Sequence, residues 1–578
     1  MVRPGSFLLV LAPVFLATGA RAQLDPLYEV HGLAPGDWFG YSVACAGDVD
    51  GDGTSDFIVG AHQNLNYGHS PYPGYARVYS GADASLLWHF EGDGTNWIDG
   101  PDDHFGAVVD GLGDVDGDGH DDLLIGAFKD DNGGAFNSGM VRVLSGLDGS
   151  ILQQHDGEAI GDRMGISAAC LGDLDGDLVP DFVTGVYKDD TLAYNGGSAR
   201  VHSGADGAQL FVFDGDDEGE ALGWAARPAG DVDGDGVVDV VVGSPNDDEN
   251  GDLSGSASVY SGAGGALLFH WVGAAPGDYF GFAVDGAGDV DADGHDDLIV
   301  GAIQSTLNGQ SSGPGYARVL SGADGALLFE LWGEAPLDQL GYAVRGAGDL
   351  DQDGRADFLV GAPRAVTLGQ SPSGLAGYAR LYSGRTGRLL FTFLGSAPDD
   401  QFGVALDVLT DLDGDGLAEL LFGSCEDDAA QSRPGSARVV PGGLVLLERY
   451  CVAAPNSAGA GALLGHAGTL SVARNDLVLF ADGCPPEHFG LFYYGSQAPQ
   501  MPFGDGWRCV GGDVFRLGVV GTGADGSASF ALDLEEPPQP AGRITPGSTW
   551  HFQFWYRDIP AGMSGFNLSD ALTGIFAP

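Results

Sequence analysis

One nine-residue stretch, repeated seven times, constrains the fold of this chain more than any other feature. The first copy is DVDGDGTSD, residues 48–56, and the others begin at residues 114, 173, 231, 289, 349 and 411. Positions 1, 3, 5 and 9 are acidic in every copy. Successive copies start 58 to 66 residues apart, and this regular spacing predicts a repeat architecture.

The chemistry of the nine-residue stretch predicts a cation site. Alternate side chains can point the same way, so the carboxylates at positions 1, 3 and 5 are expected to converge, and glycine at positions 4 and 6 permits the turn that brings the ninth side chain back. Crowded carboxylates repel one another unless a cation lies among them. A flexible loop of oxygen ligands suits Ca²⁺ better than Mg²⁺. Position 7 has no common side-chain chemistry, which is typical of a ligand supplied by the backbone carbonyl.

We therefore predict up to seven Ca²⁺ sites with a structural role, the alternative being Asp/Gly-rich turns without metal. The third site is doubtful, because Leu178 replaces the turn glycine and Pro180 stands two residues on. The predicted ligands, in loop order, are Asp48, Asp50, Asp52, Thr54 and Asp56; Asp114, Asp116, Asp118, His120 and Asp122; Asp173, Asp175, Asp177, Val179 and Asp181; Asp231, Asp233, Asp235, Val237 and Asp239; Asp289, Asp291, Asp293, His295 and Asp297; Asp349, Asp351, Asp353, Arg355 and Asp357; and Asp411, Asp413, Asp415, Leu417 and Glu419.

Each repeat unit contains four short runs with strand character. In the first unit they are FGYSVACAG (residues 39–47), DFIVGA (56–61), GYARVYS (74–80) and LLWHFEG (86–92). Four short strands separated by Gly-rich turns are typical of a propeller blade. We therefore predict an all-β chain with a seven-bladed β-propeller of four-stranded blades.

The count of strands leaves the last blade short of its fourth strand. Residues 27–40, LYEVHGLAPGDWFG, resemble a fourth strand that leads into the next unit, as in residues 267–281. We expect the N-terminal strand to close the last blade, which leaves no open sheet edge in the ring. The competing closure uses residues 444–447.

These residues resemble the FG-GAP repeats of the integrin α-subunit propeller and its bacterial relatives. The FG element stands intact at Phe39-Gly40, Phe105-Gly106, Phe280-Gly281 and Phe402-Gly403, and the GAP element at residues 361–363. The resemblance covers residues 27–441. It implies a seven-bladed propeller with Ca²⁺ in the hairpin loops of one face and partners on the opposite face. Because no inserted ligand-binding domain is evident, the integrin mode of binding cannot be carried over whole.

The ends of the chain differ from the repeats. Residues 1–22 have the charge and apolar pattern of a secretory signal peptide, so we expect a secreted or cell-surface protein. The propeller is expected over residues 23–443 and a small β-sandwich-like domain over 444–578. Its motifs resemble a C-terminal domain of large exported bacterial proteins. Export permits disulfides, and Cys451–Cys509 is the favoured pair of the six cysteines.

The predicted function is recognition of an extracellular protein or glycan by a calcium-bound propeller, as in adhesion. A formal charge of −58 argues against nucleic acid as a partner. No run after the N-terminus is long enough to span a membrane. We find no catalytic motif, and the GQSSG at residues 309–313 does not follow a strand into a helix. The alternatives are an extracellular hydrolase with a site at the propeller mouth, or a purely structural surface component; the partner and oligomeric state are not predicted.

Six of the seven third strands carry an arginine at one position, and Ser258 takes its place in the fourth unit. We interpret these arginines as partners in structural ion pairs, with a ligand-facing ring as the alternative. Trp97, Tyr67 and Tyr72 lie in variable loops, where binding residues are often found.

Overall fold

The structure is a computed structural model of the whole chain. It describes residues 26–578 except for short gaps at 63–72, 95–102, 132–134, 305–312, 352–353, 364–375, 398–399, 426–433, 443–447, 460, 468–469, 471, 473–474, 476, 525, 535, 546–547, 560–563 and 577–578. The regular elements of the described chain are β-strands, apart from one short 3₁₀ turn at Pro540–Gly542, so the predicted all-β class is confirmed.

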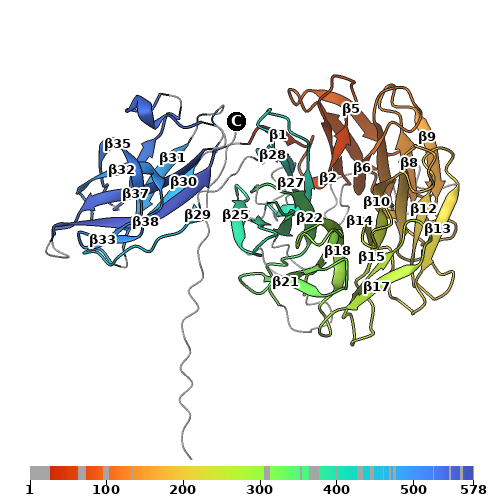
Figure 1. Cartoon of the computed structure of the whole chain (residues 1–578). Helices are drawn as coiled ribbons and strands as arrows, with labels where there is room; N and C mark the ends of the chain where they lie inside the picture. The colour runs from red at the N-terminus through yellow and green to blue at the C-terminus, as the bar shows by residue number, and fades with distance from the viewer. Residues whose placement is uncertain are drawn as a thin grey trace, which may run out of the picture.

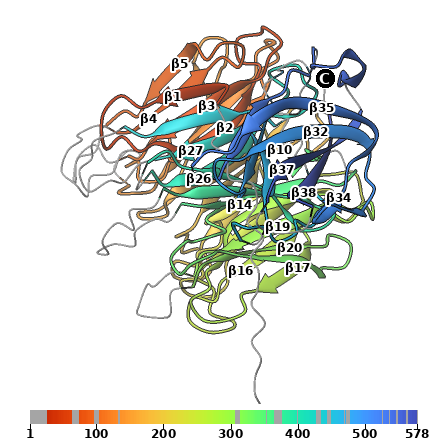
Figure 2. The same cartoon turned by 90° about the vertical axis from the view of Figure 1, so that its left-hand side faces the viewer.

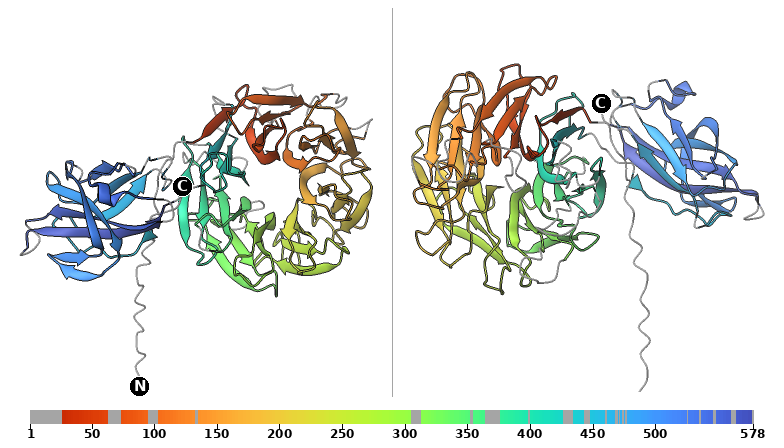
Figure 3. Two further views of the ribbon diagram at one scale, coloured as in Figure 1. Left: turned by 45° about the horizontal axis from the view of Figure 1, so that its top comes forward. Right: turned by 180° about the vertical axis from the view of Figure 1, so that it is seen from behind.

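Seven four-stranded antiparallel sheets form a ring in the described part of the chain (Figures 1 and 3). The first strands of neighbouring sheets contact one another around the central axis. These first strands are β2 (Phe39–Gly47), β6 (Val108–Gly113), β10 (Met164–Gly172), β14 (Ala225–Gly230), β18 (Phe280–Gly288), β22 (Ala343–Gly348) and β26 (Phe402–Val408). The second strands are β3 (Asp56–Ala61), β7 (Asp122–Ala127), β11 (Asp181–Val186), β15 (Asp239–Ser244), β19 (Asp297–Ala302), β23 (Asp357–Ala362) and β27 (Leu420–Ser424).

The outer half of each sheet follows the same order. The third strands are β4 (Tyr75–Tyr79), β8 (Met140–Leu144), β12 (Ser198–His202), β16 (Ser256–Tyr260), β20 (Tyr316–Leu320), β24 (Tyr378–Tyr382) and β28 (Ser436–Val440). The fourth strands are β5 (Leu86–Glu91), β9 (Ile151–Asp156), β13 (Gln209–Asp214), β17 (Leu267–Val272), β21 (Leu327–Trp332), β25 (Leu389–Leu394) and, in the last sheet, β1 (Tyr28–His31). We number the units one to seven by their first strands.

The N-terminal strand closes the ring, as predicted. β1 pairs antiparallel with β28, with Tyr28 opposite Val439 and His31 opposite Ser436. Figure 3 shows this first strand, in red, beside the last sheet, in teal. The competing closure, residues 444–447, lies outside the described residues.

The FG and GAP motifs mark the places where neighbouring sheets meet backbone to backbone. A Cβ on Gly60 would lie 2.1 Å from the carbonyl oxygen of Gly106, and a Cβ on Gly423 would lie 2.0 Å from that of Gly40. Only glycine permits such an approach. The residue before each FG glycine is buried, at 0% exposure for Phe39 and 1% for Met164, so Met or Leu can replace Phe in this apolar contact.

A second group of sheets follows the ring and lies beside it (Figures 1 and 2). A buried apolar cluster connects Leu420 and Phe422 of β27 with Leu464 and Phe554 of this group. Its strands are β29 (Glu448–Arg449), β30 (Leu463–Ala467), β31 (Val478–Asp482), β32 (Phe489–Gln497), β33 (Met501–Phe503), β34 (Gly506–Arg508), β35 (Gly511–Gly521), β36 (Ala528–Ala531), β37 (Thr549–Arg557) and β38 (Phe566–Ile575). Among the described residues, no helix has the length and apolar character needed to cross a membrane.

Candidate metal centres

The seven acidic loops join the first strand of each sheet to the second. Because the strands are antiparallel, all seven loops lie at one end of the ring, which we call the loop face. The other end carries the starts of the first strands and the ends of the second strands, and we call it the opposite face.

The ninth carboxylate of each loop is a buried hydrogen-bond acceptor. In the first loop, Asp56 has no exposed surface. Its Oδ2 accepts the backbone N–H of Val49 at 2.8 Å, and its Oδ1 accepts that of Gly81 at 3.0 Å. Because Gly81 follows the third strand, this side chain connects the loop to the outer half of the sheet. Asp122, Asp181, Asp239, Asp297 and Asp357 make the same two bonds.

The first carboxylate of each loop holds the turn. Oδ2 of Asp48 accepts the N–H of Gly53 at 2.9 Å, and the equivalent bond at position 6 occurs in the other six loops. Position 4 has positive φ even where it is not glycine, as at Ala292, where φ is 54°. The turn is therefore set by the carboxylate as well as by glycine.

In the first, second and seventh loops, the structure brings three or four of the predicted carboxylates together. One oxygen each from Asp48, Asp50 and Asp56 lies within 4.8 Å of the others, and the equivalent residues Asp114, Asp116 and Asp122 form the same group. In the seventh loop the group is Asp411, Asp413, Asp415 and Glu419, so position 5 joins there as predicted. Asp353 lies outside the described residues.

Several oxygens in these loops are left without a hydrogen bond. No donor from the described residues reaches Oδ1 of Asp48, Oδ1 of Asp291 or Oε1 of Glu419, although all three atoms are buried. An orphaned carboxylate oxygen is costly, and a hard divalent cation prefers such oxygens. The residues present therefore fit Ca²⁺ in these loops.

Burial changes the acidity of the ninth carboxylate. It raises the pKa of Asp56, Asp122, Asp239 and Asp297 to about 6. It also raises the pKa of Asp357 to about 7 and that of Glu419 to about 8. The cause is loss of solvation, which disfavours the charged form, and a bound cation would compensate this charge.

The third loop keeps the common hydrogen bonds despite its unusual sequence. The N–H of Leu178 donates to Oδ2 of Asp173 at 2.9 Å, as glycine does in the other loops. Leu178 has φ of 73°, a left-handed conformation that disfavours leucine. Its side chain is 89% exposed, so it fits without a clash.

Neighbouring loops are hydrogen-bonded to each other, which the sequence analysis missed. The N–H of Asp121 donates to the carbonyl of Asp48 at 3.0 Å, Oδ2 of Asp121 accepts the N–H of Asp48 at 2.7 Å, and Nδ1 of His120 donates to the carbonyl of Val49 at 2.8 Å. His295 and Asp296 make the same contacts with the fourth loop. The tripeptide HDD at residues 120–122 and 295–297 was the available signal. Pro180, at the position of Asp121, has no N–H to donate.

Comparison with known proteins agrees with the repeat architecture of the ring. The FG-GAP repeat model matches residues 39–79 and 340–376. The chain carries FG-GAP repeats. It is 31% identical to integrin alpha-4 of Xenopus laevis over 201 residues, which is 33% of this chain and 18% of the relative. It is 30% identical to integrin alpha-5 of Xenopus laevis over 221 residues, 36% of this chain and 20% of the relative. The chain thus spans about a fifth of the length of the curated relatives it matches.

The first strands of the ring carry a network of charges around the central axis. Nη1 of Arg227 lies 3.2 Å from Oδ2 of Asp110, and Arg345 lies 3.3 Å from Asp285 and 2.7 Å from Asp407. The backbone N–H groups of Cys45 and Cys170 donate to Asp407 and Asp110. Burial raises the pKa of Cys45 to about 11, so this cysteine is a neutral thiol as expected. The sequence analysis missed the network, although Asp and Arg recur at the same strand position.

The opposite-face end of the axis is lined by aromatic rings that lie in or just before the first strands of the ring. A cavity of about 190 Å³ is bordered by Tyr41, Trp224, Phe282 and Tyr342, and Arg227 is also among its lining residues. The ring centroids of Trp224 and Phe282 are 5.6 Å apart, and those of Phe282 and Tyr342 are 5.0 Å apart. Three loop aromatics singled out from the sequence, Trp97, Tyr67 and Tyr72, lie outside the described residues, as do residues 309–312 of GQSSG.

Five of the six third-strand arginines make ion pairs with described acidic residues, as predicted, and Nε of Arg77 donates to Nδ1 of His89 at 3.2 Å. Arg200 lies 2.7 Å from Asp189, Arg318 lies 2.9 Å from Glu330, and Arg438 lies 2.9 Å from Glu29 of the closing strand. In the fourth repeat, Oγ of Ser258 lies 2.9 Å from Nδ1 of His270. Nε2 of His270 lies 3.0 Å from Glu249.

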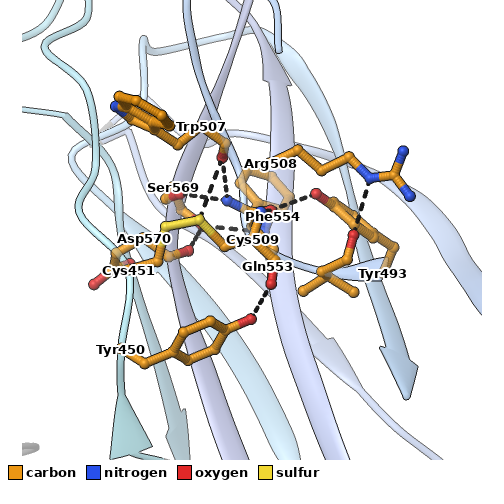
Figure 4. Close-up of a disulfide and its surroundings, with 11 residues drawn as sticks. Tyr450, Cys451, Tyr493, Trp507, Arg508, Cys509, Gln553, Phe554, Ser569 and Asp570 are labelled. Atoms are coloured by element: carbon orange, nitrogen blue, oxygen red, sulfur yellow. Dashed lines mark hydrogen bonds between the residues drawn. A yellow bond between two sulfur atoms is a disulfide. The ribbon is translucent and has the colours of Figure 1, made fainter. Parts of the chain in front are cut away.

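In the sheets after the FG-GAP repeats, Cys451 and Cys509 form a disulfide, the pair favoured from the sequence. Figure 4 shows Gln553 beside it. Oε1 of Gln553 accepts the N–H of Cys509 at 3.0 Å, and Nε2 donates to the carbonyls of Trp507 at 2.8 Å and Ser569 at 2.9 Å. This buried amide holds strand ends in place around the disulfide.

Proposed function

We propose that this chain is an exported, calcium-binding β-propeller that recognises an extracellular protein or glycan partner. The seven loops hold structural Ca²⁺ at one face, through the carboxylates of positions 1, 3, 5 and 9. The residue at position 7 supplies a backbone carbonyl. Residues 1–22 direct export, residues 23–443 form the propeller, and residues 444–578 form a separate domain. Integrin relatives and the repeated acidic loops support this proposal.

The observation that carries the recognition role is the aromatic cavity at the opposite face. Binding sites are concave, mostly apolar and lined by aromatic rings with a few polar groups. The rings of Trp224, Phe282 and Tyr342 line this cavity, and the guanidinium of Arg227 is among its polar groups. Calcium at the other face would keep the ring rigid, and a rigid scaffold is what a recognition surface needs.

A hydrolase is the alternative, and Ser258 with His270 and Glu249 is the arrangement that would serve it. Ser258 is only 6% exposed, so a substrate carbonyl cannot reach its Oγ without movement of the sheet. A nucleophile needs such access as well as an adjacent base. We therefore favour recognition over hydrolysis.

The test is a binding screen of the full chain in Ca²⁺ against immobilised glycans and extracellular proteins, repeated with Trp224→Ala. The proposal expects a partner whose affinity falls at least about tenfold in Trp224→Ala. Trp332→Ala is the matched control, because Trp332 is 46% exposed on an outer strand away from the cavity. Equal loss of binding in both variants, or no Ca²⁺-dependent partner, would contradict the proposal.

A further inference from the structure

Three carboxylates outside the seven loops meet at the opposite face, between the first and second units. Asp93 follows β5, Asp103 precedes β6 and Asp130 follows β7. One oxygen from each lies within 4.8 Å of the other two. The three residues therefore form an acidic group at the end of the ring away from the predicted calcium loops.

Asp130 carries a buried oxygen that no donor from the described residues satisfies. The residue is 4% exposed, and no hydrogen-bond donor from the described residues reaches its Oδ2. Asp103 is 1% exposed, and its Oδ2 accepts the N–H of Gly94 at 2.9 Å. Leaving such an acceptor unpaired beside other carboxylates costs free energy, so the site calls for a positive charge.

In the third unit, an arginine side chain pairs with the aspartate that is equivalent to Asp130. There Nη2 of Arg200 lies 2.7 Å from Oδ2 of Asp189, and Oγ of Ser198 donates to the same oxygen at 2.7 Å. Asp189 holds the position in unit three that Asp130 holds in unit two.

The second unit has an arginine at the same strand position, Arg142, but its guanidinium contacts other residues. Across the strand pair, Gln154 stands opposite Arg142, whereas Val212 stands opposite Arg200. Oε1 of Gln154 accepts Nε–H of Arg142 at 2.9 Å, and Nη2 of Arg142 lies 3.6 Å from Asp93. The guanidinium is thus held by Gln154 and Asp93, and in the part of the chain that the structure describes no donor reaches Oδ2 of Asp130.

We propose that Asp93, Asp103 and Asp130 bind one Ca²⁺ ion, which takes the place that a guanidinium occupies in unit three. Three carboxylates and one arginine leave a net negative site of hard oxygens, which is the donor set that Ca²⁺ prefers. The side chain of Asp93 is 43% exposed, which gives the ion a route from solvent. Burial, together with Asp103 and Asp93, raises the pKa of Asp130 to about 7, as expected of a carboxylate without its counter-ion.

The experiment counts Ca²⁺ bound per full chain by equilibrium dialysis at saturating Ca²⁺. Asp130→Asn is expected to bind one ion fewer than the unsubstituted chain. Asp131→Asn is the control, because it removes the same charge from the neighbouring residue, which lies outside the group. Gln154→Val is the second variant; it leaves all three carboxylates in place, frees Arg142 to pair with Asp130, and is likewise expected to lose one ion.

The same count separates this site from the seven loops. If the loops bind no ion but this site does, the unsubstituted chain binds one and Asp130→Asn binds none. Equal counts for the unsubstituted chain, Asp130→Asn and Gln154→Val would overturn the proposal, and Asp130 would then hold a proton instead. Crystals soaked in Mn²⁺ give a second readout, because an anomalous peak among the three carboxylates is expected and its absence also overturns the proposal.

Discussion

The two faces of the ring are built from the same seven units but differ in how strictly they repeat. At the loop face, the hydrogen bond from position 6 to the first carboxylate recurs in every unit. At the opposite face, the residue that neutralises a buried acid changes from unit to unit. Arg200 does so for Asp189, whereas Arg142 is diverted from Asp130.

This difference separates the features that local sequence determines from the features that depend on contacts between units. At the loop face, the carboxylates at positions 1 and 9 bond backbone groups of their own unit, so the same nine residues give the same loop. The opposite face depends on side chains from two units and from facing strands. There the facing residue is Gln154 in unit two and Val212 in unit three, and the arginine opposite it pairs with different residues in the two units.

Removal of Ca²⁺ is expected to have the largest effect, because it acts on the whole loop face at once. A ligand at 100 times its dissociation constant stabilises a protein by about 2.7 kcal/mol per site. Several such sites would exceed the usual margin of about 5–15 kcal/mol. We expect EDTA to lower the melting temperature of the full chain sharply, as measured by scanning calorimetry. An equal melting temperature in Ca²⁺ and EDTA would mean that the loops are turns without metal.

The second prediction concerns the pH dependence of the chelated protein. The pKa of Asp56 is raised from 3.8 to about 6 by burial, and that of Glu419 to about 8. At a pH between the unfolded and the folded pKa, such a carboxyl is protonated in the folded chain but ionised in the unfolded chain. The free energy of unfolding therefore falls as the pH rises through this range. In EDTA we expect the melting temperature to decrease from pH 4 to pH 8. In Ca²⁺ the trend should weaken or reverse, because the cation favours the charged carboxylates; the same downward slope in both would contradict this account.

Much of the ring could be predicted from the sequence because its determinants are local. The acidic loops, the four strands per unit and the closing strand each leave a contiguous pattern, and the structure places β1 beside β28 as expected. The disulfide partners Cys451 and Cys509 were also favoured in advance.

The remaining features depend on contacts between units. The network of Arg345 with Asp285 and Asp407 joins three strands that are about 60 residues apart in sequence, and no local pattern specifies which charges meet. The orphaned oxygen of Asp130 arises from the cross-strand register of Gln154, which the sequence alone does not give. Position 5 is absent from the ligand groups of the first two loops but present in that of the seventh, although the nine-residue pattern is acidic at this position in all three.

The third prediction tests the two arginines of the opposite face. Arg200 and Asp189 are both buried, with side chains 8% and 5% exposed, so Arg200→Ala leaves a buried carboxylate without its partner. Such a loss costs about 3–5 kcal/mol. Arg142→Ala removes a more exposed pair, whose Asp93 is 43% exposed, and is expected to cost about 1 kcal/mol or less. Chemical denaturation of both variants in Ca²⁺ measures the difference, and equal costs would mean that the two units are not distinguished by this pairing.

The smallest expected effect is a gain in stability from Leu178→Gly. This change restores glycine at position 6 of the third loop, the one loop that lacks it there. Leu178 holds a left-handed conformation with φ of 73° and an 89% exposed side chain. The left-handed conformation costs an L-residue about 1–2 kcal/mol, and glycine removes this cost but loses more entropy on folding, about 0.4–1 kcal/mol. We therefore expect Leu178→Gly to stabilise the Ca²⁺ form by about 0.5 kcal/mol in denaturant unfolding. Leu192→Gly is the matched control, because Leu192 is 65% exposed in the same unit but has no positive φ, so this change should destabilise. A loss in both variants would show that backbone strain at position 6 does not set the third loop apart.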